Sequence, residues 1–393
     1  MDATSCRTRA VNTRTDAVRK LIYVSGTRAD FGLMCSTLQL AAAHPLLDVS
    51  VVATGMHLNP QLGHTVDEIH QADLHVCAQV PIDTDTRTQA SMSSAIGACI
   101  QGLTQVFERE RADIVLLLGD RGEMLAAAIA ALHLGIVCVH VHGGERSGTV
   151  DEPVRHAISK LCQYHLVATR QSRERLLRMG EPAAQVFITG APGLDGLAQS
   201  ANVARPELCS LLGLSDAPFV LALFHPVVQQ ADEAYLQTQV LLLALQQLAL
   251  PVVWMAPNAD AGSLGILRAL DEVDLPAGSQ RFVNLPRAHF CAAMRHCAVL
   301  VGNSSAGIIE AASFGTRVLN LGLRQHLRER SDNVVDLPEF DVPSIYKALV
   351  HAASQGRSSC DNVYGDGHAG ERIVALLSSV PLDSSVILKT NTY

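Results

Sequence analysis

The segment ADIVLLLGDRGEMLAAAIAALHLGIVCVHVH, residues 112–142, decides the fold class of this 393-residue chain. It contains an apolar run at 112–120, an alanine-rich stretch of helical character at 122–135 and a second β-branched apolar run at 136–142. A buried strand, a helix and another buried strand of these lengths are typical of a βαβ unit, in which both strands lie parallel in one sheet.

The same alternation of apolar runs and amphipathic stretches extends over most of the chain. Further predicted strands lie at 21–26, 49–54, 164–169, 185–190, 218–226, 251–258, 296–305 and 316–322. Strands that alternate with helices in this way form parallel sheets covered on both faces. Because the series restarts after a stretch with Pro, Gly and short polar segments at 191–216, we predict an α/β protein with two doubly wound, Rossmann-like domains that face an interdomain cleft.

The domain boundaries follow from these segments. We predict a flexible N-terminal extension at 1–20, a first domain at 21–200, a second domain at 201–369 and a C-terminal segment at 370–393. The C-terminal segment begins with a stretch of helical character, and we expect this helix to pack back on the first domain.

Composition excludes several classes of protein. Hydrophobic residues make up 48% of the chain and charged residues 17%, so a large buried core forms easily and disorder is not expected. The net charge is −8, and no basic cluster typical of nucleic-acid binding is present. No apolar run is long enough to span a membrane, and the polar N-terminus is unlike a secretory signal. The ten scattered cysteines form no CxxC pair, which favours buried thiols in a reducing cytoplasm.

Polar side chains gather where the predicted strands end. They are Arg28–Asp30, Asp120–Arg121, His140–Glu145, His225, Asn258 and Asn303–Ser305. Ligands of parallel α/β sheets bind beyond the carboxyl ends of the strands, so we expect one site that draws on both domains. The chain has no Walker A motif and no GxGxxG after its first strand, so neither an ATP P-loop nor a nicotinamide site is predicted.

The segment VLVGNSSAGIIEAASFG, residues 299–315, indicates an anion site. Ser304 or Ser305 is a natural N-cap, and the free N–H groups and dipole of the following helix attract negative charge. Glu310 lies one to two turns into that helix, where a carboxylate can bond vicinal hydroxyls such as those of a ribose. A basic run that begins at Arg324 follows directly and strengthens the prediction of an anionic ligand.

Six motifs occur in a characteristic order. They are GTRADFGL (26–33), GDRGEMLAAA (119–128), HVHGGERSGTVDEPVRHAISK (140–160), HP (225–226), PNADAGS (257–263) and VGNSSAGIIEAASFGTRVLNLGLRQ (301–325). Over about residues 21–380, this combination closely resembles the hydrolysing UDP-N-acetylglucosamine 2-epimerases that open sialic-acid biosynthesis. The resemblance implies a GT-B-like fold, UDP held mainly by the second domain, and a homodimer or homotetramer. It implies no cofactor, neither nicotinamide nor a catalytic metal.

The resemblance also assigns site residues. It places UDP contacts at Arg28, His225, Asn258, Ser304, Ser305, Glu310 and Arg324, and the catalytic carboxylates at Asp120 and Asp151. To these the residues themselves add Arg121 as a candidate for UDP binding and His142, Glu145 and Arg155 as candidates for catalysis. The implied reaction eliminates UDP from UDP-N-acetylglucosamine to give 2-acetamidoglucal, which is then hydrated to N-acetylmannosamine. Proton transfer at the weakly acidic C2 needs positioned acid–base groups, and the departing diphosphate needs cations.

His142 departs from the family pattern, because many members have a catalytic glutamate at this position. If both lie in a strand, His140 and His142 share one face at the carboxyl end, and imidazole titrates near neutrality. Either His142 acts as acid or base, or it only binds substrate while Glu145 supplies the carboxylate. The histidine resembles the legionaminic-acid branch of the family, whose substrate is a UDP-2,4-diacetamido-2,4,6-trideoxy sugar, so two substrates stay open.

Two electrostatic relationships are expected around the carboxylates. Burial at a strand end raises the pKa of Asp120, and the neighbouring Arg121 counteracts that shift. Arg155 follows Asp151 by four residues on a predicted helix, so the two side chains face each other and Arg155 orients Asp151.

Three alternatives belong to other classes. One is a zinc site, whose candidate ligands are His140, His142, Glu145, Asp151 and His156, although the elimination requires no metal. A GT-B glycosyltransferase would share the fold and the nucleotide site, but it would need no paired acids around C2. A catalytically inactive UDP-sugar sensor would not need them either. Within the family, the segments GGExSGTxD and RHAISK favour the hydrolysing branch over the non-hydrolysing epimerases.

Overall fold

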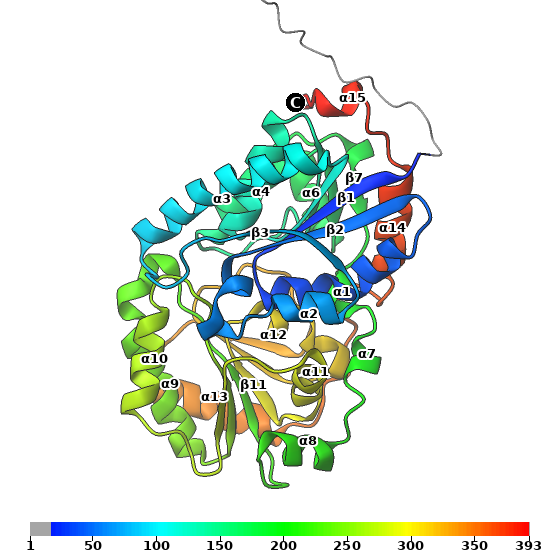
Figure 1. The fold of residues 1–393 in the computed structure, drawn as a ribbon. Helices are drawn as coiled ribbons and strands as arrows, with labels where there is room; N and C mark the ends of the chain where they lie inside the picture. Colours follow the sequence, from blue (N-terminus) through cyan, green and yellow to red (C-terminus); the bar gives the residue numbers. More distant parts are fainter. Residues whose placement is uncertain (1–16, 393) are drawn as a thin grey trace, which may run out of the picture.

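The computed structural model describes residues 17–392 and contains two α/β units, one above the other in Figure 1. Each unit is built on a parallel sheet, with seven strands in the first half of the chain and six in the second. The predicted fold class, two doubly wound Rossmann-like domains, is confirmed. Residues 1–16, most of the predicted extension 1–20, lie outside the described residues.

The first unit has the strand order β3-β2-β1-β4-β5-β6-β7, and every neighbouring pair is parallel. Its strands are β1 (Arg19–Ser25), β2 (Leu47–Thr54), β3 (His75–Val80), β4 (Ile114–Leu118), β5 (Val137–Val141), β6 (Tyr164–Val167) and β7 (Val186–Ile188). Its helices are α1 (Arg28–Ala42), α2 (Val66–Gln71), α3 (Gln89–Glu110), α4 (Gly122–His133), α5 (Asp151–Leu161) and α6 (Arg170–Arg178). The order changes direction between β1 and β4, the switch point beside which ligands bind in such sheets.

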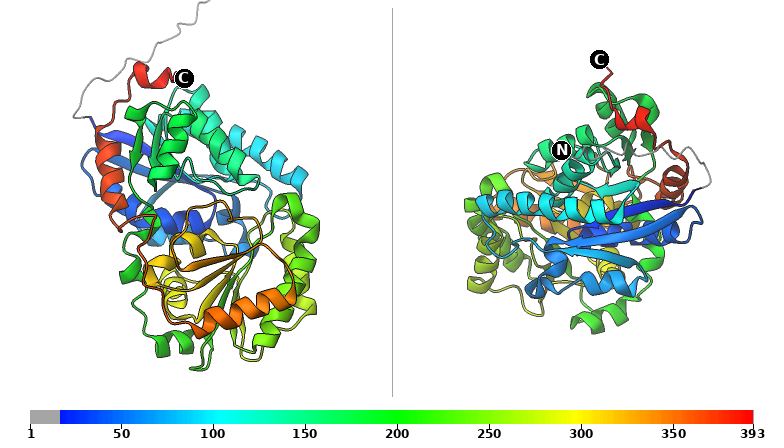
Figure 2. Two further views of the ribbon diagram at one scale, coloured as in Figure 1. Left: turned by 180° about the vertical axis from the view of Figure 1, so that it is seen from behind. Right: turned by 45° about the horizontal axis from the view of Figure 1, so that its top comes forward.

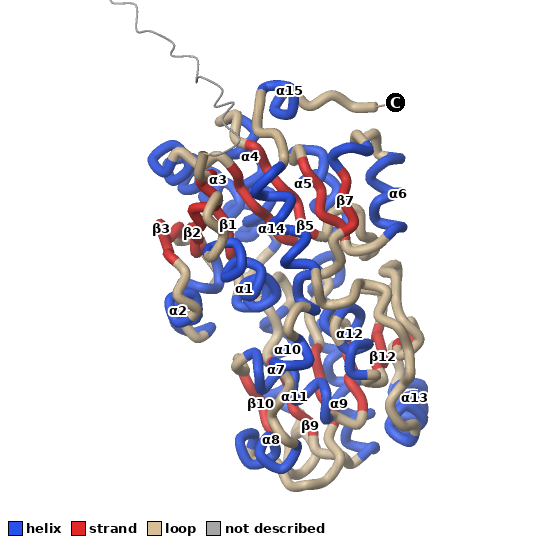
Figure 3. Tube along the Cα trace, turned by 90° about the vertical axis from the view of Figure 1, so that its right-hand side faces the viewer, coloured by secondary structure: helices blue, strands red, loops and turns tan. Residues whose placement is uncertain are grey.

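The second unit has the order β10-β9-β8-β11-β12-β13, again with parallel pairs and a switch point between β8 and β11. Its strands are β8 (Val220–Leu223), β9 (Val252–Met255), β10 (Gln280–Phe282), β11 (Val299–Gly302), β12 (Val318–Leu321) and β13 (Val334–Leu337). The remaining helices are α7 (Leu197–Ser200), α8 (Arg205–Leu212), α9 (Ala234–Leu248), α10 (Ser263–Glu272), α11 (Arg287–His296), α12 (Ser305–Ile309), α13 (Val342–Ser354), α14 (Ala369–Ser379) and α15 (Ser384–Ile387). Figure 3 shows the strands of one unit side by side above those of the other.

The central strands form where the sequence is apolar at every position, because helices cover both faces of the sheet. All five residues of β4, IVLLL, are buried. Leu116 belongs to the core on one face with Met34 of α1, whereas Val115 and Leu117 belong to the core on the other face with Met124 of α4. A strand buried on both faces gains hydrophobic stabilisation from every side chain, which is why a continuous apolar run folds this way.

Three strands do not follow from the apolar pattern, namely β3, β10 and β13. Each lies at an edge of its sheet. An edge strand has a neighbour on one side only and is less completely covered, so it tolerates polar residues such as those of HVCAQV in β3 and QRF in β10. The apolar signal used for prediction is weak in such strands.

The chain crosses between the units twice, and the second crossing returns it to the first unit. At the crossing, the N–H of Ala191 donates to the carbonyl of Tyr364 at 2.8 Å. Beyond it, α14 lies against α1, and Ile373 and Leu377 belong to the first unit's core. Arg19 of β1 donates to the carbonyls of Leu377 and Val380 at 2.9 and 2.8 Å. Seen from behind, the red α14 lies with the blue strands of the first unit, while the orange α13 stays with the second (Figure 2).

Two properties of the whole described chain bear on the class of protein. Between residues 17 and 392, no helix is both long and apolar enough to cross a membrane. The nine cysteines in this range are free, and six of them are buried. A buried free cysteine behaves as a small apolar side chain, as the scattered sequence positions predicted.

Candidate active site

Asp120 and Arg155 form an ion pair at the end of β4. Gly119 takes a left-handed φ of 81° after the strand, and this turn carries Asp120 to the start of α4. Arg155, only 1% exposed, donates through Nη2 to a carboxylate oxygen of Asp120. The prediction that Arg155 orients Asp151 is therefore wrong. Arg155 points inward to the neighbouring strand end, whereas Asp151, at the first position of α5, faces Arg324 at 3.8 Å.

His140 ties the turn after β4 to α5. Its Nε2–H donates to the carbonyl of Gly119 at 2.7 Å, and its Nδ1 lies 2.9 Å from the hydroxyl of Ser159. Burial lowers the pKa of His140 to about 3, so the ring is neutral near physiological pH. A neutral imidazole donates at one nitrogen and accepts at the other, as this pair of contacts requires. His140 therefore holds together two elements that carry the expected acid–base groups.

His142 lies one residue beyond the end of β5 and has a left-handed φ of 64°. The expectation that His140 and His142 share one face of a strand is wrong, because the alternation of a strand does not apply to a residue in the turn. The backbone N–H of His142 still donates to the carbonyl of Leu166 at 3.1 Å, which fixes the turn to β6. The Nδ1 atom of His142 contacts a carboxylate oxygen of Glu145, so the two residues proposed as alternatives in the sequence act as a pair.

Glu145 is 3% exposed and contacts a cation from the second unit. One carboxylate oxygen faces His142, and the other accepts a hydrogen bond from Nη1 of Arg328. Burial by itself favours the neutral acid, but the charge of Arg328 and the hydrogen bond from His142 hold the pKa of Glu145 below its usual value. Glu145 is thus a buried, ionised carboxylate, which is tolerated inside a protein when cations and hydrogen bonds compensate its charge.

Asn303 joins the ends of β8 and β11 in the second unit. Its Oδ1 accepts from the N–H of His225 and its Nδ2 donates to the carbonyl of His225, both at 2.8 Å. The strand ends approach so closely that a Cβ on Gly302, whose φ is 137°, would lie 2.0 Å from the carbonyl oxygen of Leu223. The N–H of Asn258 lies 3.3 Å from Nδ1 of His225. Burial and nearby arginines lower the pKa of His225 to about 3, so its ring is a neutral acceptor.

The predicted anion segment is a short capped helix. Ser304 is the N-cap of α12, where its hydroxyl accepts from the N–H of Ala306 at 3.4 Å, and Ser305 is the first helical residue. Glu310 ends the helix, is 3% exposed and forms an ion pair with Arg287 of α11. Arg287 was not predicted, because a basic residue at the start of an amphipathic helix has no signal in the sequence.

Three predicted arginines line the ends of the strands. Arg28, at the start of α1, pairs with Glu68 at 2.7 Å. Arg121 contacts Glu123 at 3.2 Å, whereas the carboxylate of Asp120 pairs with Arg155. Arg324 donates to the carbonyl of Asn303 at 3.0 Å, directly beside the capped helix.

The residues predicted from the two halves of the chain meet at one interface. Arg328 contacts Glu145, Arg324 lies 3.8 Å from Asp151, and Arg121 lies 3.7 Å from Asp260. Each of these pairs joins the carboxyl end of one sheet to that of the other. Four of the predicted site residues, Arg121, Glu145, Asp151 and Arg324, therefore lie at this interface.

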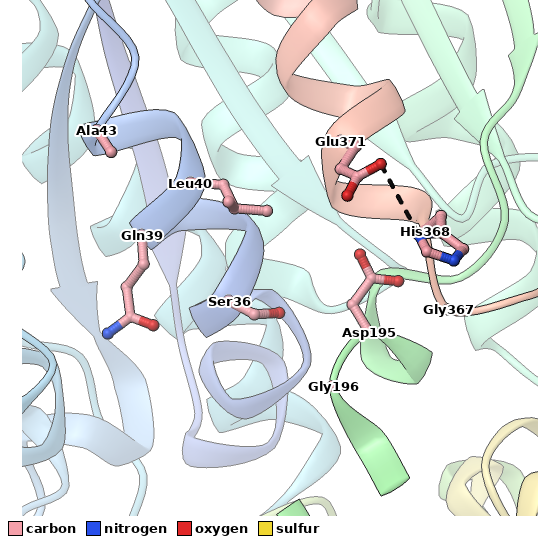
Figure 4. Close-up of a pocket in the computed structure, with 9 residues that line it drawn as sticks. All are labelled: Ser36, Gln39, Leu40, Ala43, Asp195, Gly196, Gly367, His368 and Glu371. Carbon is pink, nitrogen blue, oxygen red and sulfur yellow. Dashed lines mark ion pairs between the residues drawn. The ribbon is translucent and has the colours of Figure 1, made fainter. Parts of the chain in front are cut away.

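A separate surface pocket of about 480 Å³ lies elsewhere, between α1 and the start of α14 (Figure 4). Its lining residues are Ser36, Gln39, Leu40, Ala43, Asp195, Gly196, Gly367, His368 and Glu371. None of them was predicted as a site residue. The carboxylate of Asp195 accepts from the N–H groups of Ala369 at 2.9 Å and of Gly370, so it caps α14. The carboxylate of Asp195 therefore has a structural role at the crossing between the units.

The zinc alternative has no support in the described chain. Of its candidate ligands, His140 contacts Gly119 and Ser159, and His142 pairs with Glu145. Over residues 17–392, no group of three or more histidine, cysteine, aspartate or glutamate side chains is arranged to hold a metal ion.

Two parallel α/β sheets whose carboxyl ends meet define the class as a GT-B-like protein. The family model for UDP-N-acetylglucosamine 2-epimerase matches residues 40–378, and the chain belongs to this family. The predicted resemblance to this family is thereby confirmed.

Similar proteins agree with this assignment. The UDP-N,N'-diacetylbacillosamine 2-epimerase (hydrolyzing) of Legionella pneumophila is 46% identical over 379 residues, which is 96% of this chain and 100% of that protein. The UDP-N-acetylglucosamine 2-epimerase of Neisseria meningitidis is 32% identical and covers 89% of this chain and 92% of its own. The crystal structure of UDP-GlcNAc 2-epimerase from Neisseria meningitidis bound to UDP-GlcNAc has the same fold, with a TM-score of 0.75 at 20% identity over 91% of this chain and 99% of that one. The predicted class, a hydrolysing UDP-sugar 2-epimerase, is confirmed.

Proposed function

We propose that this enzyme hydrolyses UDP-N,N'-diacetylbacillosamine, a UDP-2,4-diacetamido-2,4,6-trideoxy sugar, to UDP and the free sugar with inverted C2. The similarity that carries this proposal is the 46% identity to the Legionella pneumophila enzyme along its whole length. This substrate is one of the two that the sequence left open. The product belongs to nonulosonic-acid synthesis of the legionaminic type.

UDP-N-acetylglucosamine is the second candidate substrate, and the product would then be N-acetylmannosamine. It is supported by the 32% identity to the UDP-N-acetylglucosamine 2-epimerase of Neisseria meningitidis. The two sugars share C1 and C2, where the reaction takes place, and differ at C4 and C6. The same elimination and hydration therefore apply to both.

In the first step, a base removes the proton from C2. The electron pair of the C2–H bond forms the C1=C2 double bond, and the C1–O bond breaks with its electrons leaving on UDP. We assign the acid–base work to Asp120, Asp151 and the pair of His142 and Glu145, which the structure gathers at the ends of β4 and β5 and at the start of α5. Glu145 accepts from Nδ1 of His142, and that tautomer leaves Nε2 as the basic atom.

The leaving diphosphate carries the negative charge that develops in this step. We assign its stabilisation to Arg28, Arg121 and Arg324 and to the capped start of α12 at Ser304. Glu310, His225, Asn258 and Ser305 complete the proposed UDP site. In the second step, water adds to C1 and C2 takes a proton on its other face, which restores the proton balance and yields the free sugar.

Two expectations about the assembly and location belong to this proposal. We expect a homodimer or homotetramer in the cytoplasm, as the family resemblance implies. Light scattering of the purified protein measures the first, and fractionation of cells that express it measures the second. We expect neither a nucleic acid nor a membrane as partner.

The proposal is tested by incubating the protein with each UDP-sugar in deuterated water, without added metal or nicotinamide. NMR follows the release of UDP and the configuration and deuterium content at C2. Faster release from the diacetamido sugar, with deuterium at C2 of a free manno-configured product, supports the proposal. Turnover of UDP-N-acetylglucosamine alone would assign the second candidate, and no UDP release from either sugar would contradict a hydrolysing epimerase.

A further inference from the structure

Arg328 reaches across the interface between the two units. It lies in the segment between β12 and β13 of the second unit, where its N–H donates to the carbonyl of Gln325 at 3.1 Å. Its guanidinium is 8% exposed and donates to Glu145, which follows β5 of the first unit. An ion pair that joins two domains at buried positions forms only when the domains are together, because each partner alone would be solvated.

Glu145 divides its two carboxylate oxygens between two partners. One oxygen faces Nδ1 of His142 and the other accepts from Arg328. Because the two oxygens of a carboxylate lie in one rigid plane, a hydrogen bond that holds one oxygen also fixes the orientation of the other. The position of Arg328 therefore determines how Glu145 orients the imidazole of His142. Within residues 17–392, Nε2 of His142 has no hydrogen-bond partner, which leaves this nitrogen available to a ligand.

The loop that carries Glu145 is also fixed from its own unit. Arg175 of α6 donates to the carbonyl of Gly144. A Cβ at Gly144, whose φ is 74°, would lie 2.4 Å from the carbonyl oxygen of Ser172, so the loop packs closely on α6. The first unit therefore holds this loop at Gly144, and Arg328 adds a contact from the second unit that fixes the carboxylate of Glu145 and stabilises the loop around it.

We propose that Arg328 is a positioning residue that holds Glu145 so that Glu145 orients His142 for proton transfer, which couples assembly of the acid–base pair to the approach of the two domains. This inference rests on the proposed function, because it takes the reaction at C2 as given. Arg328 acts through Glu145 and His142 and is not itself placed against the reacting atoms.

The charged groups around Glu145 determine what removal of Arg328 does. The cations Arg328 and Arg175 and the hydrogen bond from His142 favour the ionised carboxylate of Glu145. Glu329 and Tyr364 are acidic groups that also interact with Glu145. Without Arg328, the pKa of Glu145 rises because burial is then less compensated. Glu145 protonates at a higher pH, and a neutral carboxyl orients His142 less well than a carboxylate does. The acidic limb of the pH–rate profile therefore moves to higher pH.

The experiment compares Arg328→Met and Arg328→Lys with Arg330→Met as a matched control. Arg330 lies two residues away in the same segment but pairs with Asp336 of its own unit. We expect Arg328→Met to lower kcat by about 100-fold with little change in KM, and to move the acidic limb by about one pH unit. The lysine variant keeps the cation and returns the limb toward the wild-type position. Arg330→Met leaves the profile unchanged.

Two further measurements separate positioning from general damage. If Arg328 acts through Glu145, the double variant Glu145→Gln/Arg328→Met is no slower than the slower single variant. Amide exchange at residues 142–149, which requires no activity, becomes faster in Arg328→Met than in Arg330→Met. The proposal would be overturned if the acidic limb of Arg328→Met did not shift and if the losses in kcat of the two single variants added up in the double variant. If the wild-type enzyme released no UDP from either sugar, the proposed function would fail instead, and amide exchange would still decide whether Arg328 holds this loop.

Discussion

The guanidinium of Arg155 donates to the carboxylate of Asp120 and so joins the first turns of α5 to the end of β4. The two groups differ in exposure, because the Arg155 side chain is 1% exposed and that of Asp120 is 21% exposed. Nε and Nη1 of Arg155 are buried and have no hydrogen-bond partner among the described residues. A buried guanidinium with a single anionic partner depends on that partner, and it fixes the carboxylate at the edge of the proposed site.

Replacing Arg155 with methionine is expected to lower kcat by about 100-fold, because Asp120 loses the contact that positions it. Lysine at this position keeps a charge but not the planar fork, so we expect only partial recovery. Steady-state UDP release measures both effects. Arg170→Met, at an exposed position at the start of α6, is the control and should keep wild-type rates. Full turnover of Arg155→Met would contradict the assignment of this pair to the active site.

The sequence predicts the central strands well because their signal is local. A strand covered on both faces, such as β4, must be apolar at each position, and this pattern is visible without any knowledge of neighbours. The motif order likewise placed Asp120, His142 and Ser304 at strand ends, where the structure has them. Edge strands such as β3 give no comparable pattern, since half of their surface is open to water.

The partners of the site residues could not be predicted, because they depend on contacts between distant segments. Arg328 and Glu145 are 183 residues apart, and Arg287 and Glu310 pair between two helices. The spacing of four between Asp151 and Arg155 indicated a local pair, but the partly exposed carboxylate of Asp120, at the end of the neighbouring strand, is the partner of Arg155. The left-handed φ of His142 was also beyond prediction, since only the surrounding turn requires it.

Gly302 is expected to tolerate no side chain. Its φ of 137° is reserved for glycine, and a Cβ would lie 2.0 Å from the carbonyl oxygen of Leu223. Gly302→Ala must therefore separate β8 from β11 and disturb the contacts of Asn303 with His225, so we expect weaker UDP binding and a lower urea midpoint. Calorimetric titration with UDP tests the first effect. Gly97→Ala, at an open position in α3, should instead raise the free energy of unfolding by about 0.5–1 kcal/mol.

Stability should fall with acidification because of His140. Its pKa is about 3 in the folded protein, against an ordinary value of about 6.5 in the unfolded chain. Between these values the unfolded chain binds a proton that the folded protein does not, so the free energy of unfolding decreases as pH falls through this range. At pH 5, protonation of His140 in the unfolded chain is expected to lower the free energy of unfolding by about 2 kcal/mol. Urea titrations at pH 7 and pH 5 measure it, and His140→Gln should reduce the difference between the two.

The C-terminal tail fixes the far end of the helix that carries Asp151 and Arg155. Lys389 donates to the carbonyls of Ser159, Lys160 and Cys162 at 3.0, 3.0 and 2.6 Å, at the end of α5. The same ammonium lies 2.6 Å from the fully buried carboxylate of Glu181, which also contacts His165 at 2.8 Å. These partners outweigh burial and lower the pKa of Glu181 to about 2.

Replacing Lys389 with methionine leaves Glu181 with less compensation, and loss of one partner of a buried ion pair costs about 3–5 kcal/mol. Because the folded pKa of Glu181 is depressed, its stabilisation is present above its unfolded pKa and is lost as pH falls through the folded value. In Lys389→Met the folded pKa rises, so acid unfolding should begin at a higher pH than in the wild type. Urea midpoints measured from pH 7 to pH 3 test this, with the exposed Lys347→Met as control. Equal acid sensitivity of the two variants would show that the tail does not stabilise Glu181.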